Sequence, residues 1–102
     1  MTDLTPEVAE VLQGLKAIQT LTALQNAIFK LLASRALDAT ICPSDAARAV
    51  YPAAAHWRAA MPAVRAVAAQ LVDKGKLEVT QGGKVVDIRT AKGPVRLRLP
   101  RA

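Results

Sequence analysis

The first third of the chain carries apolar residues at helical spacing. In "TPEVAEVLQGLKAIQ", Thr5 offers an N-cap and Pro6 suits the first helical position. Apolar residues then recur every three or four positions, namely Val8, Val11, Leu12, Leu15 and Ile18. The pattern predicts a helix over residues 6–19. The capping-box pattern of "TALQ" predicts a second helix over residues 22–35.

Two more helices are predicted in the middle of the chain. A short extended piece around Thr40 and Ile41 precedes Pro43, which favours a helix start, and this helix ends before Pro52. The stretch "WRAAMPAVRAVAAQL", residues 57–71, continues as a helix to residue 74, and Gly75 ends it. Because proline fits only the first turn, Pro62 predicts that the regular helix begins near residue 61.

After Gly75 the hydrophobic period changes from helical to alternating. "KLEVTQ" and "VRLRL" read as strands, and the glycine-bounded basic loop "GGKVVDIRTAKG" lies between them. "GGK" lacks the spacing of a phosphate loop and is interpreted as a turn. The order predicts a mainly α fold with a small β-hairpin (α+β), a winged helix-turn-helix with an extra N-terminal helix. We divide it into that helix, residues 1–20, and a winged-helix domain, residues 21–102.

Three uncommon pieces occur in one order: "TICPSDAARAV", "WRAAMPAVRAVAAQLVDKGKLEVTQGG" and "GPVRLRL". Together they resemble a bacterial domain-of-unknown-function family that shares an "ICPS…WR…M…VR…G…ITQ…GPIRLRL" pattern. The resemblance covers roughly residues 24–99 and leaves out the first 20. It implies a winged-helix-like fold and supplies no activity and no catalytic residues.

Composition narrows the class of protein. A lone cysteine, Cys42, cannot form an internal disulfide, and no Cys/His cluster has metal-ligand spacing. The N-terminus does not read as a signal peptide, and no apolar run is long enough for a membrane span. We therefore expect a cytoplasmic protein without membrane partner, metal or cofactor. Without a recognisable nucleophile–base or acid-pair motif, we expect no enzyme.

Positive charge is concentrated at the C-terminal end. The net charge is +6, and residues 76–102 hold seven basic residues against two acidic ones, whereas residues 1–75 hold seven against six. This asymmetry favours a nucleic-acid partner, with DNA preferred over RNA. The candidate phosphate contacts are Arg58, Arg65, Lys84, Arg89, Lys92, Arg96 and Arg98.

Each candidate also has a structural interpretation. Arg58 and Arg65 lie seven residues apart at the border of the predicted buried face, where carboxylates such as Asp45 or Asp87 would hold them. Arg96 and Arg98 project from one face of a strand, where charge also protects an edge against pairing. Arg48 has the same two interpretations. These alternatives remain open from the sequence.

The helix over residues 57–71 is poorly equipped to read bases. A helical wheel predicts a buried face with Trp57, Met61, Val64, Ala68, Leu71 and Val72. Its outward face carries alanines, Pro62 and Asp73, and Gln70 alone could reach a base edge. We therefore expect weak sequence preference.

Two remaining side chains are interpreted structurally. Cys42 precedes a helix start, where a thiol can become reactive, but a plain buried cysteine is the commoner case. His56 reads as a linker or packing residue. The alternative function is a protein-interaction or assembly module without nucleic acid. Its apolar N-terminal helix would then form a homodimer or pack on the domain's own core.

Overall fold

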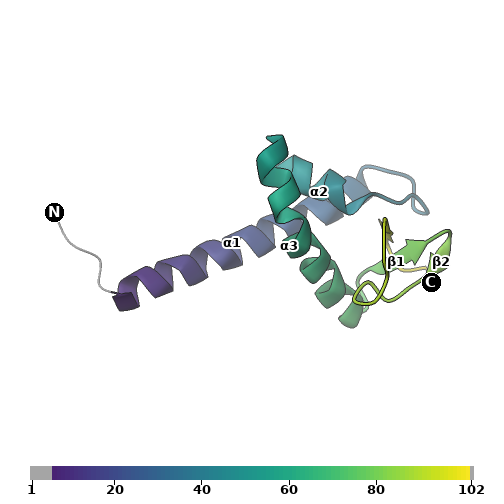
Figure 1. The fold of residues 1–102 in the computed structure, drawn as a ribbon. Coiled ribbons are helices and arrows are strands. Elements are labelled where there is room, and N and C mark those ends of the chain that lie inside the picture. The colour runs from purple at the N-terminus through teal and green to yellow at the C-terminus, as the bar shows by residue number, and fades with distance from the viewer. Residues whose placement is uncertain (1–5, 102) are drawn as a thin grey trace.

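The computed structural model describes residues 6–101 and has three helices followed by a small sheet (Figure 1). The helices are α1 (Pro6–Ala33), α2 (Pro43–Val50) and α3 (Ala54–Asp73), and the strands are β1 (Glu78–Gln81), β2 (Lys84–Val85) and β3 (Arg96–Arg98). With the short bridge at Ile41 between α1 and α2, this is the winged-helix order in an α+β fold. The predicted fold class is confirmed.

The two helices predicted before residue 36 are one helix. No glycine or proline lies between residues 19 and 22, so the capping pattern at Thr22 does not interrupt α1. Leu15 and Leu24 are nine residues apart, which is about two and a half turns, and they face opposite sides of the helix. Leu24 is fully buried, whereas Leu15 is 50% and Ile18 60% exposed.

The N-terminal half of α1 therefore projects from the rest of the molecule (Figure 1). We call residues 6–19 the arm. The domain's own core does not cover Leu15 and Ile18. The predicted cap at Thr5 lies outside the described residues, and Val8, Val11 and Leu12 lie outside the described side chains. The proposed division at residue 20 stays a prediction, and α1 runs continuously across it.

α3 begins earlier than the sequence predicts. It starts at Ala54 and contains Pro62 as an interior residue, so the expectation of a regular helix from residue 61 is wrong. Pro62 is exposed, and its ring lies away from the core. On the opposite side, Val64, Ala68 and Leu71 are buried as predicted, whereas Val72 is exposed. Gly75, with a φ of 71°, follows the end of the helix in the left-handed conformation that glycine favours.

The sheet has the order β2-β1-β3, and all its pairs are antiparallel. β1 and β3 are the two predicted strands. β2 was not predicted: Gly82 and Gly83 both have positive φ and form a two-residue turn that pairs Gln81 with Lys84. Ile41 bridges Leu97, so the predicted extended piece adds to the edge of β3.

One core joins the helices to the sheet. Its largest fully buried side chains come from every layer: Leu24, Ile28, Ile41, Val64, Leu71, Leu77, Val79, Val95 and Leu97. Within residues 6–101, no helix combines the length and hydropathy that a membrane span requires.

Candidate functional site

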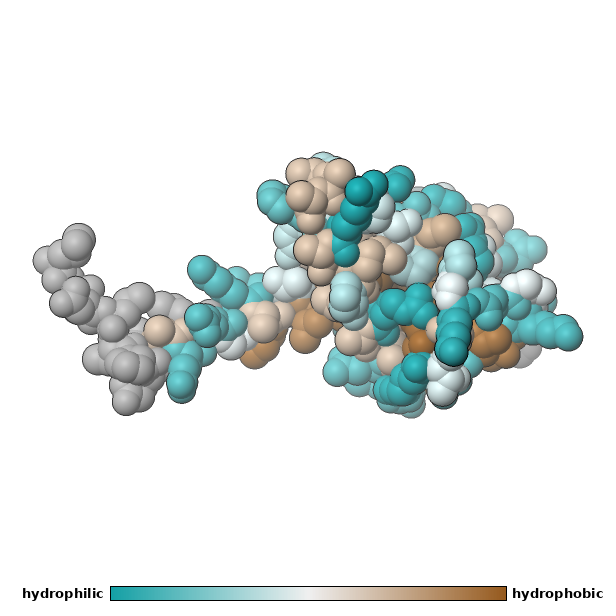
Figure 2. Space-filling model, viewed as in Figure 1, coloured by the Kyte–Doolittle hydropathy of each residue, from teal (hydrophilic) through white to brown (hydrophobic). Residues whose placement is uncertain are grey.

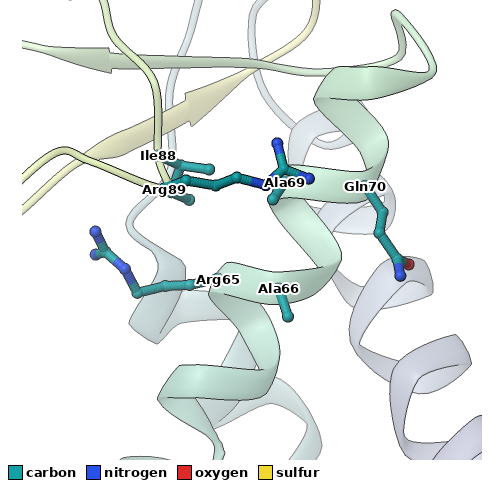
Figure 3. A pocket seen from close by; sticks show the side chains of 6 residues that line it. All are labelled: Arg65, Ala66, Ala69, Gln70, Ile88 and Arg89. Carbon is teal, nitrogen blue, oxygen red and sulfur yellow. The ribbon is translucent and has the colours of Figure 1, made fainter.

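A groove lies between α3 and the segment 86–95, which we call the wing. It consists of two hollows that share Arg65. The first has a volume of about 390 Å³ and is lined by Arg65, Ala66, Ala69, Gln70, Ile88 and Arg89. The second, of about 280 Å³, is lined by Arg65 with residues 42–44, Met61 and residues 93–95. Figure 3 shows Arg65 reaching from α3 towards the wing, whereas Gln70 points away on the other side of the helix. We call the two hollows the α3–wing groove.

Hydrogen bonds hold the wing against the domain. The Gln81 side-chain amide donates to the carbonyls of Lys92, at 2.6 Å, and Pro94, at 3.1 Å. Arg65 Nη2 donates to the carbonyl of Ala91 at 3.2 Å, and Ile88 is buried in the core. These contacts fix the position of the wing. The sequence predicted a loop there and gave no sign of the contacts.

Two of the seven candidate residues are paired with carboxylates. Arg89 forms a bidentate contact with Asp73, at 3.1 and 2.7 Å, and its guanidinium lowers the pKa of Asp73. Arg98 lies opposite Glu78 in the β1–β3 register and donates to it at 2.8 and 3.2 Å. The hydrogen bonds from Arg98, and then from the Arg101 backbone, lower the pKa of Glu78. The Arg98 side chain is only 12% exposed.

The other five candidates have no carboxylate partner among the side chains that the structure describes. Arg96 belongs to β3, and its side chain contacts the short extended segment before α2. It donates to the hydroxyl and carbonyl of Thr40 and to Cys42 Sγ. Lys84, at the β1–β2 turn, and Lys92, on the wing, are exposed.

The carboxylates expected to hold Arg58 and Arg65 have other partners. Asp45 Oδ2 accepts a hydrogen bond from the Cys42 backbone N–H at the start of α2. Asp87 Oδ1 accepts one from the Arg89 backbone N–H. Neither carboxylate forms an ion pair with Arg58 or Arg65, and Arg65 instead donates to the carbonyl of Ala91.

Arg65 lines the second hollow, and Arg96 and Lys92 are linked to it only through neighbouring residues. Arg65 shares its second hollow with Cys42, to which Arg96 donates, and Arg65 bonds the carbonyl immediately before Lys92. In Figure 2, hydrophilic side chains gather over the sheet end of the molecule, while the N-terminal part of α3 above them is largely apolar. Such an arrangement can hold an anion, because none of the three cations is neutralised by a carboxylate in the described chain.

Comparison with family models identifies a match over residues 21–100, to a family described as "Protein of unknown function (DUF3253)". The chain belongs to the DUF3253 family. The resemblance noted from the sequence motifs is thereby confirmed. A search of curated proteins finds no match.

The DUF3253 match begins where α1 meets the core. Leu21 is the first residue of the match and packs against the core cluster, whereas the arm precedes it. All the residues of the α3–wing groove lie within the matched region. The groove therefore lies within the region that matches the DUF3253 family, and the arm lies outside that region.

A second basic group of the DUF3253 domain was missed by the sequence reasoning. The guanidinium carbons of Arg48, on α2, and Arg58, on α3, lie 4.4 and 5.3 Å from the centroid of the Trp57 ring. Trp57 is half-buried and packs on the core, as predicted. Its ring also makes cation–π contacts with these two guanidinium groups. Arg48 and Trp57 are separated by the turn between two helices, so no local pattern could signal their contact.

Two further side chains were singled out from the sequence: Cys42, which lines the second hollow of the groove, and His56. Cys42 is half-buried and free. His56 is exposed and lines an alanine-rich hollow between α1 and α3. In the part of the DUF3253 chain that the structure describes, no three His, Cys, Asp or Glu side chains are grouped as metal ligands.

Proposed function

We propose that this protein binds duplex DNA by gripping backbone phosphates in the α3–wing groove. The observation that carries the proposal is that Arg65 lines the groove and has no carboxylate partner among the described side chains. Arg96 donates to Cys42 of the same lining, and Lys92 follows the carbonyl that Arg65 holds, also without a carboxylate partner there. Arg58 lies two turns before Arg65 on the same side of α3, and Lys84 adds charge at the β1–β2 turn. Arginine forks match phosphate oxygens bidentately.

The ion pairs divide the seven sequence candidates by role. Arg89 and Arg98 stabilise the wing and the sheet through Asp73 and Glu78. The phosphate contacts at the groove are then made by Arg65, Lys92 and Arg96, and Arg58 and Lys84 are flanking contacts outside it.

Weak sequence preference follows from the outward face of α3. Ala59, Pro62 and Ala66 are exposed there and present no donor or acceptor to base edges, and Gln70 points away from Arg65 (Figure 3). Phosphate contacts position a protein on a duplex without reading its sequence. We therefore expect affinities that depend strongly on salt and little on base sequence.

The test is fluorescence anisotropy of a labelled mixed-sequence duplex, titrated at several salt concentrations. The variant Arg65→Gln with Arg96→Gln should bind more weakly and lower the salt slope by about two, one unit for each lost phosphate contact. Lys16→Gln with Arg35→Gln removes the same charge from the arm and from the turn after α1, and serves as the control. If both double variants behave alike, net charge and not the groove is responsible, and the proposal fails.

A second candidate function is supported by the arm. Leu15 and Ile18 are exposed about one helical turn apart, on the side of α1 that faces away from the core. These residues suit a protein-interaction module, including a homodimer through the arm. Sedimentation of the full chain beside a chain without residues 1–19 tests this: a larger mass for the full chain alone supports assembly, and two monomers exclude arm-mediated homodimers.

A further inference from the structure

Arg48, Trp57 and Arg58 form a cluster where α2 turns into α3. Arg48 lies in the last turn of α2, and Trp57 and Arg58 lie in the first two turns of α3. Both arginines are exposed, while the indole is half-buried against the core. The two guanidinium carbons are at most 9.7 Å apart, the sum of their 4.4 and 5.3 Å distances to the ring centroid.

This cluster gathers two positive charges without a negative one. Neither arginine has a carboxylate partner among the described side chains. Cations are attracted to the electron-rich face of an indole, which restrains both side chains near one ring. A guanidinium whose position is already restrained loses less conformational entropy on binding an anion than an unrestrained guanidinium does.

We propose that Arg48 and Arg58, held on Trp57, bind a second backbone phosphate of the duplex. This inference rests on the proposed function and extends its surface from the α3–wing groove to the other end of α3. Arg58 and Arg65 are seven residues apart, so they lie on one side of the helix about 10.5 Å apart along its axis. Phosphate contacts then follow α3 from the wing to the α2–α3 turn.

The cluster contains its own reporter, because Trp57 is the only tryptophan of the chain. A phosphate that engages the two guanidinium groups alters the charge directly beside the indole. Trp57 fluorescence should therefore change when duplex is added. Arg48→Gln should diminish that change, whereas Arg35→Gln, an exposed arginine in the turn after α1, should leave it intact.

Binding isotherms give the quantitative test. Arg48→Gln and Arg58→Gln should each weaken duplex binding and lower the salt slope by about one, and Arg35→Gln should do neither. Trp57→Phe keeps an aromatic face and should retain most of the affinity, whereas Trp57→Leu removes that face and should behave like the arginine variants. Circular dichroism melting of each variant shows whether the fold is intact.

The outcomes separate this inference from the proposed function. If Arg65→Gln with Arg96→Gln lowers the slope but Arg48→Gln and Arg58→Gln do not, the cluster is not a phosphate site, although the groove is. If the unaltered protein does not bind duplex, the proposed function fails. Titration with inorganic pyrophosphate then decides the cluster alone: an Arg48-dependent change in Trp57 fluorescence supports an anion site, and no change overturns it.

Discussion

Replacing Pro62 by alanine should stabilise the protein. Pro62 is the ninth residue of α3, well beyond the first turn, and it is exposed, so its side chain contributes little to the core. It has no N–H to donate to the carbonyl of Arg58, and its ring crowds that carbonyl. A proline costs about 3 kcal/mol relative to alanine in a helix interior.

The net gain is smaller than this penalty. Proline also restricts the unfolded chain, which contributes about 0.4–1 kcal/mol of stability that the alanine variant loses. The difference leaves about 2 kcal/mol in favour of Pro62→Ala. With a urea m-value of about 1–3 kcal/mol/M, the unfolding midpoint should rise by about 1 M.

Urea unfolding followed by far-UV circular dichroism measures this shift. Ala66→Gly, one turn later on the same exposed face, is the matched variant and should lower the free energy of unfolding by about 1 kcal/mol. If Pro62→Ala leaves the midpoint unchanged or lowers it, Pro62 lies in the first turn of a separate helix, and the continuous α3 is refuted.

Two further predictions concern stability. Because the folded-state pKa of Glu78 is lowered below its ordinary value of 4.5, its ion pair with Arg98 stabilises the fold above that pH, and the contribution is lost as pH falls through the folded pKa. Urea midpoints of the unaltered protein and of Glu78→Gln should therefore differ at about pH 6 and converge towards about pH 3, and a constant difference would contradict the pairing. Removing residues 1–19 should change the free energy of unfolding by less than about 0.5 kcal/mol, since all described side chains from Gln13 to Gln19 are exposed; a larger loss in the same assay would mean that the arm packs on the domain.

Strands β1 and β3 and several helix ends were predictable because their signals are local. Alternation in "VRLRL" placed Leu97 inward and Arg96 outward, and both are found so. Pro43 and Gly75 marked a helix start and a helix end through their own backbone preferences. Winged-helix order followed from these elements alone.

Helix continuity was misjudged for a related reason. The capping pattern at Thr22 and the proline at position 62 both favour a helix boundary locally, but the neighbouring turns continue the helix on either side. Leu15 in the arm and Leu24 in the core-facing half of α1 lie on opposite sides of one helix. The spacing of apolar residues along the chain does not distinguish one such helix from two separate helices that each pack on the core.

Composition and spacing by themselves determined which residues of this protein are basic, that most of the excess charge lies near the C-terminus, and that helices precede the strands. Only the tertiary structure decided which charges are neutralised. Arg96 and Arg98 look alike in sequence, yet strand register sets Arg98 against Glu78, while Arg96 lies over Thr40. Arg48 and Arg58 meet on Trp57 because α2 and α3 pack at a turn. Pairing depends on distances between side chains far apart along the chain, and folding sets those distances.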